Sequence, residues 1–240
     1  MGYQARMTNR LTNAIAALLC LGAGIPAQAD APVVVELFTS QGCSSCPPAD
    51  ALLGELVNRD DVIALSLHVD YWDYLGWTDE FADPANTERQ RGYARAAGST
   101  MIYTPQMVIE GRNQIVGTKA MELAERIEQH KQQPAPVTLA VTRSGTDMLR
   151  ITAERVGDVP GPMLVQLVRY SPEEVVEIRA GENAGKSVTY HNVVSSLEVV
   201  GEWSGDAALD MEASAVGDAP SVVIIQDGSS GPILAAARAE

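Results

Sequence analysis

The stretch VVVELFTSQGCSSCPP, residues 33–48, places two cysteines shortly after a strongly apolar run. A continuous apolar run of this length is typical of a strand that is buried on both faces. The prolines at positions 47 and 48 suit the first turn of a helix, because the N–H groups there need no partner within the helix. The pattern therefore predicts a buried strand that delivers Cys43 and Cys46 to the beginning of a helix.

Two thiols at this spacing at a helix N-terminus form a reactive dithiol. The helix end directs unpaired N–H groups and a partial positive charge at the first sulfur, which favours the thiolate. We expect Cys43 to be the nucleophile and Cys46 the resolving thiol. A structural staple would close almost no loop and stabilise little, and a structural zinc site would need a second half supplied by histidines or carboxylates. The spacing therefore favours redox chemistry.

Residues 1–29 have the pattern of an export signal. Two arginines form a basic front, an apolar stretch rich in Ala and Leu follows, and Ala27-Gln28-Ala29 is a small-x-small cleavage site. We expect the mature chain to begin at Asp30 and to be periplasmic or secreted. Cys20 lies within the signal, so the exported protein would keep only the cysteine pair.

The net charge of the chain excludes some classes of binding partner. The formal net charge is −14, and no basic run interrupts it. Such a chain repels nucleic acid and anionic lipid headgroups. No apolar stretch after the signal is long enough to cross a bilayer. We therefore expect no nucleic-acid partner and no membrane-spanning segment.

The sequence predicts two domains, 30–133 and 134–240, separated at a Gln- and Pro-rich stretch. Apolar periodicity in the first domain predicts strands and helices in alternation. The expected elements are a strand at 33–38, a helix at 49–58, a strand at 62–68, a helix at 84–97, a hairpin of 106–110 with 114–116, and a helix at 119–130. This order is the thioredoxin topology, so we expect an α/β, thioredoxin-like domain.

Residues 134–240 alternate apolar and polar side chains, as half-buried strands do. The expected strands are 137–142, 148–154, 163–170, 175–179, 188–199, 222–226 and 233–238. The Gly-rich segment 181–187 is interpreted as a hairpin turn. We expect an all-β, sandwich-like C-terminal domain.

Two further residues of the first domain are candidates for the chemistry of the dithiol. Pro105, in the dipeptide Thr104-Pro105, opens the third strand, and we predict a cis bond there that shapes a groove for a thiol substrate. Glu36 interrupts an apolar strand, and burial would raise its proton affinity and allow it to relay protons to Cys46. The alternatives are a strand-initiating proline and a solvent-facing carboxylate.

The second strand is followed by a histidine and a cluster of aromatic residues. His68, next to Asp70, is a candidate proton carrier or metal ligand, or else a structural histidine bonded to Asp70 or to backbone. Tyr71, Trp72 and Trp77 are expected to form a wall of the active site, or to be a packed loop that covers the sheet.

Four segments resemble the signatures of a family of secreted bacterial thioredoxin-like proteins, catalogued as domain of unknown function 1223. They are ELFTSQGCSSCPPAD at 36–50, HVDYWDYLGW at 68–77, YTPQM at 103–107 and YHNVV at 190–194. The resemblance implies a thioredoxin fold with an extra β domain, but no established reaction. The broader thioredoxin superfamily implies that Cys43 and Cys46 are the redox pair, Pro105 the cis proline and Glu36 the buried acid.

The sequence supports two functions of different classes, beside a third interpretation as a redox-inert interaction module in which the aromatic loop and the β domain bind a partner. The first is a thiol–disulfide oxidoreductase of the cell envelope, with no cofactor beyond its redox-active disulfide, that acts on protein or small-molecule thiols. The alternative is a copper-binding protein, in which Cys43, Cys46 and His68 hold Cu(I), since that ion prefers thiolate and imidazole ligands. The sequence identifies neither the substrate nor the redox partner.

Overall fold

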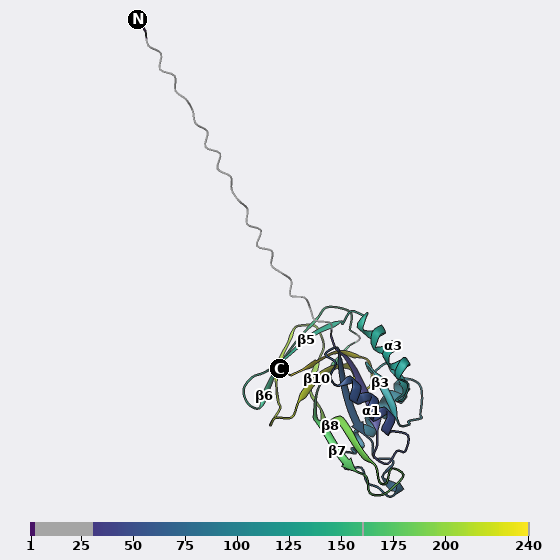
Figure 1. Ribbon diagram of the computed structural model, residues 1–240. Helices are drawn as coiled ribbons and strands as arrows, with labels where there is room; N and C mark the ends of the chain where they lie inside the picture. Colours follow the sequence, from purple (N-terminus) through teal and green to yellow (C-terminus); the bar gives the residue numbers. More distant parts are fainter. Residues whose placement is uncertain (3–30, 160, 240) are drawn as a thin grey trace.

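The computed structural model describes residues 1–2, 31–159 and 161–239 (Figure 1). Apart from its first two residues, the predicted export signal at 1–29 lies outside the described residues. The elements in chain order are β1 (Val33–Thr39), α1 (Pro47–Leu56), β2 (Val62–His68), η1 (Asp73–Leu75), α2 (Pro84–Ala96), β3 (Gln106–Ile109), β4 (Asn113–Val116), α3 (Ala120–Lys131), β5 (Val137–Arg143), β6 (Met148–Arg155), β7 (Met163–Glu177), β8 (Ser187–Trp203), β9 (Leu209–Ser214), β10 (Ser221–Asp227) and β11 (Ile233–Arg238).

One large mixed sheet organises the molecule, with strand order β11-β10-β7-β8-β2-β1-β3-β4. Its central strands β1 and β2 are parallel, and every residue in both is buried. The apolar run at 33–38 is therefore a strand covered on both faces, as the sequence predicts. The other local elements of residues 30–133 also form close to the expected positions.

The two faces of the large sheet are covered differently. Side chains of β1 alternate, so that Val35 and Leu37 pack with α1 and α3, whereas Val34 and Phe38 pack with Tyr93 of α2. The three-stranded sheet β5-β6-β9 covers β7, β10 and β11 on the same face of the large sheet as α1 and α3. The cysteines and α2 consequently lie on opposite faces of the sheet.

The predicted fold class is wrong. We expected an α/β, thioredoxin-like domain followed by an all-β, sandwich-like domain, but the described residues are mostly β, with three α-helices around the mixed eight-stranded sheet. β8 pairs in parallel with β2 at Ser66 and Val193, which adds β8, β7, β10 and β11 to the sheet begun by the first half. Hydrophobic periodicity predicts that a segment is a strand but not which strand it pairs with, which explains the error.

The long strands of the second half also depart from expectation. The strands predicted at 163–170 and 175–179 are continuous as β7, which pairs with β8 along most of its length, and the turn predicted at 181–187 joins the two (Figure 1). Strand β9 was not predicted. The domain boundary near residue 134 stays a prediction, although the large sheet contains strands from both sides of it. Within the described part of the chain, no helix combines the length and apolar character that a bilayer crossing requires.

Candidate active site

The two cysteines form a disulfide at the beginning of α1. Cys46 is the N-cap residue of α1, and its carbonyl accepts hydrogen bonds from the backbone N–H groups of Ala49 and Asp50. Cys43 lies in the preceding turn, and its sulfur is 3.5 Å from Oγ of Ser45. Cys43 retains 2% of its surface exposed and Cys46 none. The predicted placement of the pair at a helix N-terminus is therefore confirmed, with Cys46 the more deeply buried residue.

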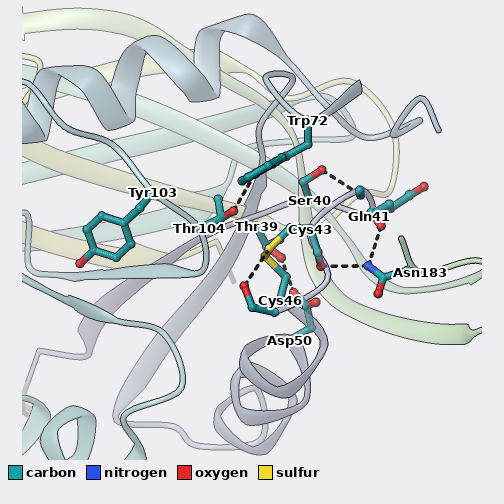
Figure 2. The surroundings of a disulfide bond; sticks show 12 residues. Thr39, Ser40, Gln41, Cys43, Cys46, Asp50, Trp72, Tyr103, Thr104 and Asn183 are labelled. Carbon is teal, nitrogen blue, oxygen red and sulfur yellow. Dashed lines mark hydrogen bonds between the residues drawn. A yellow bond between two sulfur atoms is a disulfide. The ribbon is translucent and has the colours of Figure 1, made fainter. Parts of the chain in front are cut away.

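The backbone just before the disulfide is held from the second half of the chain (Figure 2). Nδ2 of Asn183, in the β7–β8 turn, donates to the carbonyl oxygens of Gln41 and Cys43, each at 2.9 Å. Nζ of Lys186 in turn donates to Oδ1 of Asn183 at 2.7 Å. Asn183 is 1% exposed, so it replaces water as the donor to these carbonyls. A buried amide more than 130 residues away thus sets the conformation of the dithiol loop.

We expect Asn183→Ala to destabilise the protein by about 1–3 kcal/mol, because two buried carbonyls would lose their donor. The measurement is the free energy of urea unfolding of the oxidised protein. Asn58→Ala, at an exposed asparagine after α1, is the matched control and should change stability by less than about 0.5 kcal/mol. Equal stabilities of the two variants would show that the Asn183 bonds do not hold the loop.

The aromatic loop after β2 packs against the other side of the dithiol loop. A Cβ added at Gly42 would lie 3.1 Å from Cβ of Trp72, so a larger residue there would require Trp72 to shift by a few tenths of an ångström. Nε1 of Trp72 donates to Oγ1 of Thr104 at 2.7 Å (Figure 2), and Nε1 of Trp77 donates to Oε1 of Gln41 at 2.7 Å.

Tyr71 belongs to a different environment. Its hydroxyl donates to Gln90 of α2 at 3.1 Å. Of the three residues predicted to form a wall, Trp72 and Trp77 therefore contact the loop that carries the cysteines, whereas Tyr71 joins the loop to α2.

The Thr104–Pro105 peptide bond is cis, as predicted. Pro105 lies close to the first turn of α1, because a Cβ added at Gly117 would be 3.0 Å from Cβ of Pro105 and 3.1 Å from Cβ of Ala49. Together with the hydrogen bond from Trp72 to Thr104, this places the residues around Pro105 beside the disulfide-bearing turn.

A buried carboxyl that the sequence reasoning missed lies one helical turn after Cys46. Asp50 is 3% exposed, its Oδ1 accepts a hydrogen bond from Oγ1 of Thr39 at 2.7 Å, and its Oδ2 has no partner among the described residues. Burial raises the pKa of Asp50 to about 7, against the smaller opposing effects of Thr39 and His68. The sequence did contain a signal for the role of Asp50. It follows Cys46 by four residues, a spacing that places both side chains on one face of the helix.

His68 is fully buried on the α1 side of the sheet, opposite Thr39 in the β1–β2 register. Its Nδ1 pairs with Oδ2 of Asp79 at 2.7 Å, rather than with Asp70. Oδ2 of Asp79 also accepts the backbone N–H of Gln41 at 2.8 Å, which ties this pair to the dithiol loop. Asp70 instead accepts a hydrogen bond from Thr87 of α2 at 2.6 Å.

Residues from the segment at 190–194 pack against His68 and α1. The ring of Tyr190 is edge-on to His68, with ring centroids 4.8 Å apart. His191 packs against Gly54 of α1, where an added Cβ would lie 2.7 Å from its ring. The segments at 36–50, 68–77 and 190–194, far apart in the sequence, therefore converge around α1.

Glu36 is not brought to the dithiol. It alternates with Val35 and Leu37 and so points to the α2 face, where its Oε1 lies 2.6 Å from Nε of Arg89 and its Oε2 accepts the hydroxyl of Tyr93 at 2.5 Å. α1 and the cysteines lie on the opposite face. Glu36 therefore neutralises a buried guanidinium in the core, and Asp50 is the buried acid near Cys46.

The three proposed copper ligands do not gather into a site. Within residues 1–2, 31–159 and 161–239, no three His, Cys, Asp or Glu side chains are arranged to hold a metal ion. Nδ1 of His68 is paired with Asp79, whereas its Nε2 has no partner among the described residues. Both sulfurs are bonded to each other, so the pair is in its oxidised form in this structure.

The structure thus defines the protein by a mixed eight-stranded sheet and a disulfide at a helix N-terminus. Comparison with known proteins identifies its family. Residues 34–226 match the family described as protein of unknown function DUF1223, and the chain belongs to it. It is similar to a crystal structure of an Agrobacterium tumefaciens protein, with 33% sequence identity, a TM-score of 0.75, and coverage of 88% of this chain and 95% of that one. The comparison with curated proteins found no match.

Proposed function

We propose that this protein is a thiol–disulfide oxidoreductase of the cell envelope, and that Cys43 and Cys46 are its redox pair. The observation that carries the proposal is a disulfide at the N-terminus of α1 with a buried, proton-holding carboxyl one turn further along the helix. The helix end stabilises a thiolate when the disulfide opens. Cys43, with its small exposed surface, is the sulfur that meets the substrate.

The exchange proceeds by two thiolate attacks. In the reducing direction, the Cys43 thiolate attacks a substrate disulfide, forms a mixed disulfide and releases one substrate thiolate. The Cys46 thiolate then attacks the Cys43 sulfur, releases the second substrate thiolate and re-forms the Cys43–Cys46 disulfide. Two electrons pass from the protein to the substrate. The same steps in reverse oxidise a substrate dithiol.

Asp50 supplies the proton transfer that the buried sulfur needs. Its carboxylate accepts the proton of the Cys46 thiol before the second attack, and its carboxyl returns a proton when Cys46 leaves as a thiolate. A group with a pKa near the working pH transfers protons efficiently in both directions. The raised pKa of Asp50, about 7, suits this role.

The proposal is tested by measuring the redox state of the pair and its turnover. Wild-type protein is equilibrated in glutathione buffers of graded potential, alkylated and weighed by mass spectrometry. We expect one two-electron transition, and catalysis of insulin reduction by dithiothreitol. The Cys43→Ser/Cys46→Ser variant is the control. A disulfide that stays closed throughout the glutathione series, with insulin reduced no faster than by the control, would contradict the proposal.

Location in the cell envelope rests on the pattern of residues 1–29. Full-length protein with a C-terminal tag should be found in the periplasmic or extracellular fraction and lack these residues by mass. Replacing the apolar stretch of the signal with polar residues should retain the protein inside the cell. Recovery of the intact, uncleaved chain from the cytoplasm would contradict export.

The raised pKa of Asp50 predicts a pH dependence of stability. Asp50 holds its proton up to about pH 7 in the folded protein but releases it near its ordinary pKa of 3.8 when unfolded. The unfolded state therefore binds fewer protons in this interval, and stability falls as the pH rises from about 4 to about 7. Between pH 5 and pH 8, this contribution amounts to about 2–3 kcal/mol.

Asp50→Asn should reduce the fall by this amount, while Glu110, whose pKa is raised by burial to about 8, keeps its own contribution of the same sign. Urea unfolding of the oxidised proteins at pH 5 and pH 8 measures it, with Asp60→Asn as an exposed control that should keep the wild-type slope. The same slope in Asp50→Asn as in wild type would show that Asp50 does not hold a proton in the folded state.

A further inference from the structure

A cleft of about 890 Å³ lies between α2, the loop before it and the strands β7 and β8. It is on the α2 side of the large sheet, whereas the disulfide is on the α1 side. Its volume is in the upper part of the range of ligand-binding pockets, which runs from about 300 to about 1,000 Å³. The redox chemistry proposed above makes no use of it.

Carboxylates dominate the charge of this cleft. Five line it, namely Glu80, Asp83, Glu88, Glu174 and Glu198, against two guanidiniums, those of Arg89 and Arg95, and Glu88 is paired with Arg91 outside the cleft. Arg89 is neutralised by Glu36 in the core. Glu80 and Glu198 are exposed, and neither forms an ion pair with any other described residue. A concave surface with an excess of one sign of charge attracts ligands of the opposite charge.

About half of the remaining lining residues are apolar, and the others are serines, Asn86 and Gln166. Phe81 and Ala82 of the loop face Leu164 of β7 and the valines and leucine of residues 193–199 of β8. Val199 keeps 55% of its surface exposed at this site. A small inorganic or organic cation would leave this apolar surface in contact with water, whereas a peptide with interspersed basic and apolar side chains would cover it and meet the carboxylates.

We propose that this cleft is a binding site for a short peptide segment that carries lysine or arginine next to apolar residues. The cleft and the disulfide lie on opposite faces of the sheet, and Phe81 of the cleft packs edge-on against His68, with ring centroids 5.3 Å apart. The site selects by charge at its rim and by apolar contact at its floor.

The test uses a fluorescein-labelled, amidated peptide, Lys-Leu-Lys-Leu-Lys, which has no thiol. Its binding is followed by fluorescence anisotropy with the Cys43→Ser/Cys46→Ser variant, so that failure of the proposed redox function does not affect the result. We expect saturable binding that weakens as salt is added. Lys-Gly-Lys-Gly-Lys should bind several-fold more weakly, and Glu-Leu-Glu-Leu-Glu should not bind.

The same measurement on charge variants locates the site. Glu80→Lys/Glu198→Lys should weaken binding about tenfold or more, since it reverses two charges at the cleft. Glu55→Lys/Glu125→Lys makes the same change of net charge at exposed positions on α1 and α3 and should change binding less than about twofold. Val199→Ser should weaken binding several-fold. Absence of binding to the parent variant, or equal weakening by the two charge-reversed pairs, would overturn the proposal.

Discussion

Replacing Cys46 with serine is expected to convert the protein into a trap for its substrates. The Cys43 thiolate would still form a mixed disulfide, but no second thiolate would be available to resolve it. Replacing Cys43 with serine should instead abolish capture, because Cys46 is fully buried. Turnover of insulin should fall by at least about a hundredfold in both variants, since each lacks one of the two sulfurs that exchange requires.

The two variants distinguish the roles of the sulfurs. Each is incubated with an activated disulfide such as glutathione–thionitrobenzoate, and the mixed disulfide is identified by mass. We expect rapid labelling of Cys46→Ser and slow labelling of Cys43→Ser, with Ser45→Ala as a control that retains both sulfurs. Faster labelling of Cys43→Ser would reverse the assignment of nucleophile and resolving thiol.

Replacing Arg89 with methionine should destabilise the fold by about 3–5 kcal/mol, because it leaves the carboxylate of Glu36 buried without its cation. Nε of Arg89 lies 2.6 Å from Oε1 of Glu36, and both side chains are buried. The guanidinium also donates to Gln166 and to the hydroxyl of Tyr93, so its loss leaves further polar groups unpaired.

Urea unfolding at neutral pH measures this effect, and the same helix offers a matched control. Arg91 pairs with Glu88 on the exposed face of α2, and Arg91→Met should lower stability by less than about 1 kcal/mol. Adding Glu36→Met to Arg89→Met should recover part of the loss, because the uncompensated charge is removed. Equal losses in the two arginine variants would show that the buried pair does not support the fold.

The local structure of the site could be predicted from the sequence, but its chemistry only in part. The apolar run at 33–38 and the paired prolines at 47 and 48 were enough to predict a buried strand followed by a helix that begins at the cysteines. Glu36 was expected near Cys46 because it lies in the strand that leads to the cysteines. Strand alternation places it on one face or the other, but the sequence does not indicate which face α1 covers.

The prediction of the fold class was wrong for a related reason. Residues 163–203 were correctly expected to be strand-rich, and nothing in their alternation shows that β8 pairs with β2 rather than with strands of its own half. Pairing between distant strands is decided by the packing of whole faces, which no local pattern of side chains records.

By itself, the sequence determined the dithiol, its placement at a helix N-terminus, the proline before the third strand and the acidity of the chain, because each depends on neighbouring residues or on composition. Only the tertiary structure decided that Asp50 is the buried acid, that His68 pairs with Asp79 and that Asn183 holds the dithiol loop. These contacts join residues 11 to 142 positions apart, or depend on burial. Burial and long-range hydrogen bonding are properties of the packed chain, and they appear only when the sheet and its helices come together.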